Sequence, residues 1–211
     1  MEQFIYIYYS VFIQVIAGFI PLVVLWVRKV KADSALVGSI VLSFVISLIL
    51  IITGYFKQNN FFFFNTYVIG SVILFGIFYY RSIENKKMQY FVLATTILCV
   101  LIFFFELSRK DVISVTIKFQ NVFYIIWSLL FFIDFMLKSN FTDAKSKSTL
   151  IIIAAIFLYN CTSFILLNHI DFFLNKNFWI IHNLSESACK LMIAYAFWKL
   201  PNETNLQDSK T

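Results

Sequence analysis

The sequence predicts an all-α, polytopic membrane protein, folded as a bundle of seven transmembrane helices. Of its 211 residues, 61% are hydrophobic and 13% are charged, whereas soluble domains carry about 25% charged residues. The hydrophobic residues form runs that can cross a hydrocarbon core of about 30 Å at a helical rise of about 1.5 Å per residue. The runs show no sustained alternation, and open sheets cannot satisfy their backbone in lipid, so strands are excluded as spanning elements.

The first run is too long for a cleavable signal peptide, and Glu2 stands where such a peptide is basic. The fifth run is the weakest because its start is polar, although Lys118 can extend to the interface. Pro201 fits a helix stop, so residues 1–199 are predicted as the transmembrane domain and residues 200–211 as a short polar cytoplasmic tail. In chain order, the predicted spans are Phe4–Val27, Leu36–Phe56, Phe61–Tyr80, Met88–Phe105, Val115–Leu137, Thr149–Ile170 and Phe178–Trp198.

Charges between the runs predict the orientation. Eleven basic residues follow the odd-numbered spans, namely Arg28, Lys29, Lys31, Arg81, Lys86, Lys87, Lys138, Lys145, Lys147, Lys199 and Lys210. Five basic residues lie on the other side, namely Lys57, Arg109, Lys110, Lys118 and Lys176. The acids Glu106, Asp111 and Asp171 also lie on that side. The positive-inside rule therefore predicts the N-terminus outside and the C-terminus in the cytoplasm (N-out/C-in). The net charge of +6 lies in these loops, a distribution that does not indicate nucleic-acid binding.

Polar side chains interrupt the last span. At 100° per residue, Trp179, His182, Asn183, Glu186 and Lys190 fall on one face of a helix. A charge at membrane depth costs about 3 kcal/mol on insertion scales, and such groups usually face a bundle interior or a cavity. The i,i+4 spacing of the acid and the lysine predicts an intrahelical ion pair.

Two interpretations of this face stay open. In the structural one, the ion pair locks span seven against span six through Asn160, Thr162 and Ser163. In the functional one, the face lines a polar pocket open to the outside, with His182 and Asn183 nearer the mouth and Lys190 deeper. Such a pocket could hold a small anion, a metabolite or a proton.

Known catalytic and metal-binding patterns are absent from the sequence. The two histidines, His169 and His182, lack metal-site spacing, and neither a nucleophile elbow nor a glycine-rich phosphate loop occurs. We therefore predict no catalytic residue, no metal site and no cofactor. Cys99, Cys161 and Cys189 lie in apolar runs and are interpreted as small buried side chains, with a contact between the last two as the alternative.

Two further features have structural interpretations. Asp134 lies four residues before Lys138, which predicts an interfacial i,i+4 pair worth a few tenths of a kcal/mol. Gly70, Ser71 and Gly76 are predicted to let helices approach closely.

The Glu186-x-x-x-Lys190 spacing resembles microbial rhodopsins, in which an acid precedes the retinal-binding lysine by four residues. That resemblance implies a retinal Schiff base at Lys190. The chain departs from the pattern because Phe61–Tyr80 contains no charge, so the third-helix acid and the arginine of those proteins have no counterpart.

A broader resemblance covers nearly the whole chain. It rests on the order of spans, on Asn59-Asn60 before an aromatic third span, and on Phe178-Trp179-Ile180-Ile181-His182-Asn183 opening the seventh. In these features the chain resembles small seven-span bacterial membrane proteins and the membrane sensor portions of histidine kinases. The resemblance implies signal reception, or an accessory role beside a kinase. No kinase domain follows Trp198, so a signal would pass through a partner.

The expected role is a non-enzymatic sensor or accessory signalling component of the bacterial inner membrane. Its expected partners are the lipid bilayer and a signalling protein such as a histidine kinase. A small-solute transporter is the alternative, although only Pro21 and Pro201 occur and no broken helix is signalled. A membrane enzyme acting on lipid comes third, because few carboxylates and histidines converge.

Overall fold

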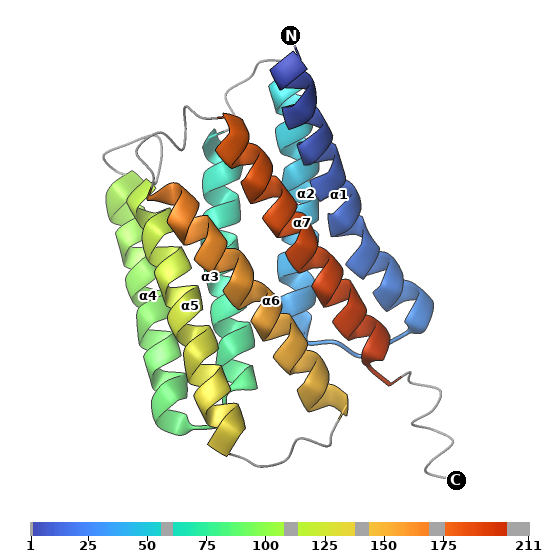
Figure 1. The fold of residues 1–211 in the computed structure, drawn as a ribbon. Coiled ribbons are helices and arrows are strands. Elements are labelled where there is room, and N and C mark those ends of the chain that lie inside the picture. The colour runs from blue at the N-terminus through green and yellow to red at the C-terminus, as the bar shows by residue number, and fades with distance from the viewer. Residues whose placement is uncertain (1, 56–60, 108–113, 138–143, 169–175, 202–211) are drawn as a thin grey trace.

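The computed structural model describes residues 2–55, 61–107, 114–137, 144–168 and 176–201. These residues form seven α-helices and no strand, which confirms the predicted all-α class (Figure 1). The helices are α1 (Glu2–Arg28), α2 (Ser34–Tyr55), α3 (Phe61–Ser82), α4 (Lys86–Leu107), α5 (Ser114–Leu137), α6 (Ala144–Leu167) and α7 (Lys176–Lys199). Outside the described residues lie several predicted features: Phe56, Lys57, Asn59, Asn60, Arg109, Lys110, Asp111, Lys138, His169, Ile170, Asp171 and the tail 202–211.

The helices form a closed ring. Each helix packs against the next along the chain, α7 packs against α1, and α3 also packs against α5. Figure 1 shows α1, α3, α5 and α7 beginning at the upper end of the bundle and ending at the lower end. We name these the N-side end and the C-side end. Ring closure brings residues about 170 positions apart in the sequence into contact, as in the bond from Gln14 to Glu186.

Six of the seven helices, α1 to α6, are long and apolar enough to cross a membrane. Their outward side chains include large apolar residues that would be costly to expose to water, such as Leu101, Phe104, Met136 and Ile165. The chain is therefore a multi-pass membrane protein by the length and composition of its helices. The seventh helix, α7, is not among the six, because its polar face lowers its apolar content.

The predicted span boundaries agree with the helices to within two residues except at α6. This helix begins at Ala144 rather than Thr149, because apolar runs locate the membrane-buried part of a helix and not the polar first turns that continue it. It ends at Leu167 rather than Ile170. Asn168 follows, and both its backbone N–H and its side-chain amide donate to the carbonyl of Phe164 at 3.2 and 2.8 Å, which satisfies the helix end.

Carboxylate side chains cap the first turns of two helices. Asp33 accepts from the backbone N–H groups of Ala35 and Leu36, which makes it the N-cap of α2. Glu106 was expected in a loop, but it is the buried penultimate residue of α4. Its carboxylate accepts from the backbone of Val115 and Thr116 at 2.8 and 2.7 Å, so one helix end caps the start of another.

Asp134 is more deeply buried than an exposed interfacial pair would leave it. Its side chain is 5% exposed and accepts a 2.8 Å hydrogen bond from the backbone N–H of Glu84, between α3 and α4. Its predicted partner, Lys138, lies outside the described residues. Spacing along one helix could not reveal this burial, because the partner is contributed by a turn some 50 positions earlier in the chain.

The C-side half of the bundle is a packed core. Trp127 lies at its centre among the rings of Tyr79, Phe123 and Tyr124, with centroids 5.3 to 6.3 Å apart. Its indole donates to Thr95 Oγ1 at 2.9 Å, and Tyr79 Oη lies 2.6 Å from Ser128 Oγ. The polar groups around Trp127 are thus paired with one another, as most buried polar groups are. Nearer the C-side end, Ser148 Oγ and Arg28 Nε are buried without a hydrogen-bond partner among the described residues.

Glycines set two of the helix contacts, as predicted. A Cβ atom added at Gly76 would lie 2.5 Å from Thr96 Oγ1 of α4, and one added at Gly70 would lie 2.5 Å from Leu42 Cδ2 of α2. At Gly76 the Cβ atom of Thr96 would also lie only 3.2 Å away, so this approach requires glycine, whereas at Gly70 the end of the Leu42 side chain could move aside.

Candidate functional site

The polar face of α7 is buried between its neighbours in the ring. Glu186 and Lys190 are 8% and 6% exposed, and Asn183 is buried beside them. The opposite face of α7 is apolar and exposed, with Ile181 and Leu191 as examples. The helix therefore turns its charges inward, where other side chains can compensate them.

Glu186 and Lys190 form the predicted ion pair, with Lys190 Nζ 2.7 Å from Glu186 Oε1. The carboxylate is also held from two other helices. Gln14 of α1 donates to Oε2 at 2.5 Å, and Ser43 of α2 donates to Oε1 at 3.4 Å. Both oxygens of the buried acid thus have partners, a condition that a buried ion pair needs.

The predicted lock between this pair and α6 is wrong. Asn160 donates to the carbonyl of Ile156 and Thr162 to that of Leu158, both within α6 itself. Glu186 instead joins α7 to α1 and α2. The sequence could not show this, because the closure of the ring decides which helix faces the acid.

His182 makes the contact with α6. Tyr159 Oη lies 3.4 Å from its Nε2 atom, and Ser163 Oγ lies 3.3 Å from its Nδ1 atom. The ring of Trp179 meets the imidazole edge-on, with centroids 6.1 Å apart. The imidazole is therefore held between two hydroxyl groups of the neighbouring helix.

Asn183 faces away from α6. Its side-chain amide donates to Ser10 Oγ of α1 at 3.0 Å, and its carbonyl accepts from Ser187 Oγ. Of the seven residues predicted as a site, Asn183 alone does not line the cavity described next.

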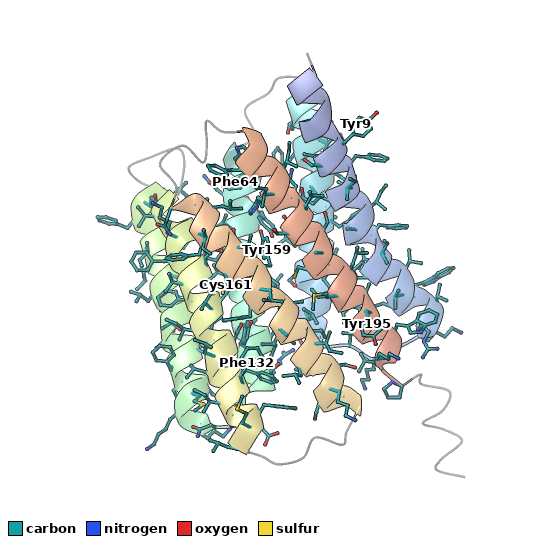
Figure 2. The ribbon with its side chains drawn as sticks, in the orientation of Figure 1. Tyr9, Phe64, Phe132, Tyr159, Cys161 and Tyr195 are labelled. Atoms are coloured by element: carbon teal, nitrogen blue, oxygen red, sulfur yellow. The ribbon has the colours of Figure 1, made fainter. Side chains whose placement is uncertain are left out.

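A cavity of about 130 Å³ lies inside the ring, with walls from α2, α3, α5, α6 and α7. It runs from residues near the N-side end, such as Phe64 and Trp179, to residues near the middle of the bundle, such as Phe75 and Ile193. Along α3 this is a depth of about 16 Å at 1.5 Å per residue. Phe64 and Tyr159, which both line it, are labelled in Figure 2. The predicted site residues that line it are Asn160, Ser163, Trp179, His182, Glu186 and Lys190.

Several polar side chains at this site were not anticipated. Besides Gln14 and Ser43, which bind Glu186, they include lining residues from α3, α5 and α6: Tyr67, Gln120, Asn121, Tyr124 and Tyr159. Their signal in the sequence is a polar or phenolic group several residues inside an apolar run, away from the interfaces where tyrosines are common.

Two donors at this cavity stand out. Asn121 Nδ2 is buried without a hydrogen-bond partner among the described residues. Lys190 Nζ has none besides its ion pair with Glu186. Gly18 of α1 lets the lysine side chain pass, since a Cβ atom there would lie 3.5 Å from Nζ.

The cavity does not fit the retinal that the rhodopsin resemblance implied. An apolar cavity of about 150 Å³ holds benzene, and a volume of about 130 Å³ is too small for a long polyene. The site also lacks a metal-binding group, because within the described ranges no three His, Cys, Asp or Glu side chains come together.

Comparison of the chain with models of known protein families, with curated proteins and with solved structures found no match to any of them.

Proposed function

We propose that the protein is a non-enzymatic sensor or accessory signalling component of the bacterial inner membrane, with seven spans in an N-out/C-in orientation. It receives a small ligand in the cavity between the helices and passes the signal to a membrane partner such as a histidine kinase. The observation that carries this proposal is the cavity itself, with the buried ion pair of Glu186 and Lys190 and the unsatisfied donor Asn121 Nδ2 at its wall.

Three arguments support counting α7 as a span. It occupies one place in a ring whose other members are apolar enough to cross a bilayer. Its polar groups are buried inside that ring, and its outer face is apolar, with Leu184 and Leu191 exposed. A helix in this position needs less overall hydrophobicity, because lipid meets only its apolar side.

The arrangement favours reception of a signal over passage of a solute. Below the cavity the C-side half is filled by the packed core around Trp127. Helices α1 and α7 connect the ligand site to the C-side end. At the site, Glu186 of α7 binds α1 and α2. At the C-side end, Arg28 of α1 contacts the last turn of α7. There its guanidinium lies 4.8 Å from the Trp198 ring centroid and donates to the Trp198 carbonyl.

Transport is the second candidate, and one observation favours it. A cavity that reaches from one end of a bundle to its middle is what an alternating-access protein presents in one of its states. A transporter would have to open the packed C-side half.

Photo-crosslinking in the native host tests the proposal. A photoreactive amino acid replaces Lys147, exposed near the C-side end, or, as a matched control, Phe62, exposed near the N-side end. We expect position 147 to crosslink a histidine kinase whose autophosphorylation changes when the gene is deleted, and position 62 to crosslink it less. If no kinase were crosslinked and the protein carried a solute across the membrane of proteoliposomes, the sensing proposal would be wrong and transport would take its place.

A cytoplasm-specific reporter tests the orientation separately. It should be active when fused at Thr211 or within 138–148 and silent near Lys57. The opposite pattern would reverse the topology.

A further inference from the structure

The cavity wall offers hydrogen-bond donors that have no acceptor. Among the described lining, Asn121 Nδ2 is a buried donor without a hydrogen-bond partner. Lys190 Nζ has one partner, Glu186 Oε1 at 2.7 Å, which leaves N–H groups of the ammonium without an acceptor among the described residues. A buried donor without an acceptor has lost its hydration and gained nothing in return. These atoms therefore point to an occupant that carries an acceptor.

The two donors belong to different walls of the cavity, α5 and α7. Asn121 lies about 10 Å along α5 from its start, at 1.5 Å per residue. Lys190 lies about 21 Å along α7, but its side chain turns back one turn to reach Glu186. An acceptor between the two walls is thus within the space that both side chains line.

The charges at the cavity are already balanced. Glu186 and Lys190 are the only Asp, Glu, Lys or Arg residues among the described lining, and they neutralise each other at 2.7 Å. An anion would add an uncompensated charge to a buried site, which is costly in a low dielectric. An uncharged occupant avoids that cost.

The rest of the wall is mostly apolar, and the space is small. Ile40, Val68, Phe75 and Ile117 line it, so the body of the occupant meets hydrocarbon and aromatic rings. By comparison with a benzene-holding cavity of about 150 Å³, a volume of about 130 Å³ suits roughly six to eight non-hydrogen atoms.

We propose that the cavity binds a small uncharged molecule with an apolar body and a hydrogen-bond acceptor, such as a carbonyl oxygen, directed at Asn121 and Lys190. This inference rests on the proposed sensing role and names the chemical class of its signal. Such a molecule partitions into the bilayer and can reach a site between helices from there.

Three probes of nearly equal size test the class on the purified full chain in nanodiscs. Cyclohexanone carries the acceptor, methylenecyclohexane replaces its oxygen by a CH₂ group, and cyclobutanecarboxylate, which has the same number of non-hydrogen atoms, carries a charge. Saturation-transfer NMR titrations give their affinities. We expect cyclohexanone to bind about fivefold or more tightly than methylenecyclohexane, as one net hydrogen bond of about 1 kcal/mol gives, and more tightly than the carboxylate.

Two variants test whether these donors cause the preference for cyclohexanone over methylenecyclohexane. Asn121→Leu removes one donor at similar volume. The double substitution Glu186→Leu/Lys190→Met removes the other without leaving an unpaired charge or adding a new donor. We expect at least one of these variants to lose the preference for cyclohexanone. Ser128→Ala, in the C-side core away from the cavity lining, should keep it.

Four results would overturn the proposal. Equal affinity for the ketone and the alkene would mean that the donors do not select the occupant. Tighter binding of the carboxylate would make it an anion site, and no saturable binding would leave water as the occupant. If both donor variants still preferred cyclohexanone, the group that selects it would lie elsewhere. Failure of the signalling role is distinguishable, because it would leave these affinities unchanged while the kinase crosslink was missing.

Discussion

The buried polar groups in the two halves of the bundle differ in their hydrogen-bond partners. In the C-side half, Tyr79 pairs with Ser128 and Trp127 with Thr95, and the rings between them leave little space. In the N-side half and the middle, polar groups from five helices surround a cavity. Among the described residues, Asn121 Nδ2 has no hydrogen-bond partner there and Lys190 Nζ has only Glu186. Both halves belong to one ring of helices, so the difference lies in the side chains and not in the backbone arrangement.

That difference indicates where stability and function reside. A satisfied polar pair in a packed core fixes one arrangement of helices. A cavity with unsatisfied donors reduces stability, and natural proteins retain such features mainly at functional sites. We therefore expect substitutions in the two halves to have different and in one case opposite effects.

The largest effect is expected at the ion pair. Removing one partner leaves a buried charge unpaired, which costs about 3–5 kcal/mol, so Glu186→Leu and Lys190→Met should each reduce the yield of folded protein. The double variant Glu186→Leu/Lys190→Met should recover much of it, as measured by fluorescence-detected size-exclusion chromatography. Wild-type yield in either single variant would show that the charge meets water.

Asp134→Asn tests the C-side end of the same comparison. The carboxylate is buried and accepts from the backbone of Glu84, and hydrogen bonds to charged groups contribute about 1.5–3 kcal/mol. The asparagine oxygen can still accept this bond but carries no charge, so we expect a loss of about 1 kcal/mol in thermal unfolding. A change of only a few tenths of a kcal/mol would restore the interfacial interpretation.

The sequence predicted seven helices because each needs only a long apolar run, which is a local pattern. It also predicted six of the residues that line the cavity, because polar groups at membrane depth are conspicuous on α6 and α7. It did not predict Gln14 or Ser43 as partners of Glu186, which lie 172 and 143 positions away. Ring closure places them there, and periodicity within one helix carries no information about it. Nor did it predict the hydrogen bond from the backbone of Glu84 to Asp134, for the same reason.

A matched pair of glycine substitutions tests how tightly the C-side half is packed. Gly76→Ala places a methyl group against Thr96, whereas Gly38→Ala meets Leu74 Cδ2 at an ordinary 3.4 Å. Alanine favours a helix over glycine by about 0.5–1 kcal/mol, and overpacking costs about 1–3 kcal/mol. Gly76→Ala should therefore destabilise by about 1 kcal/mol and Gly38→Ala should not. Equal melting temperatures would indicate a looser contact between α3 and α4.

The central claim is that the cavity retains an unsatisfied donor at Asn121, whereas the polar groups packed around Trp127 are paired. One measurement tests it most directly: the unfolding free energies of Asn121→Leu and Ser128→Ala, determined together in the same detergent. Removing an unsatisfied buried donor should stabilise the protein by about 1 kcal/mol, and removing a partner of Tyr79 should destabilise it by about the same amount. Opposite signs are the predicted result. Destabilisation by both substitutions would show that Asn121 is satisfied in its cavity, and it would contradict the difference between the halves.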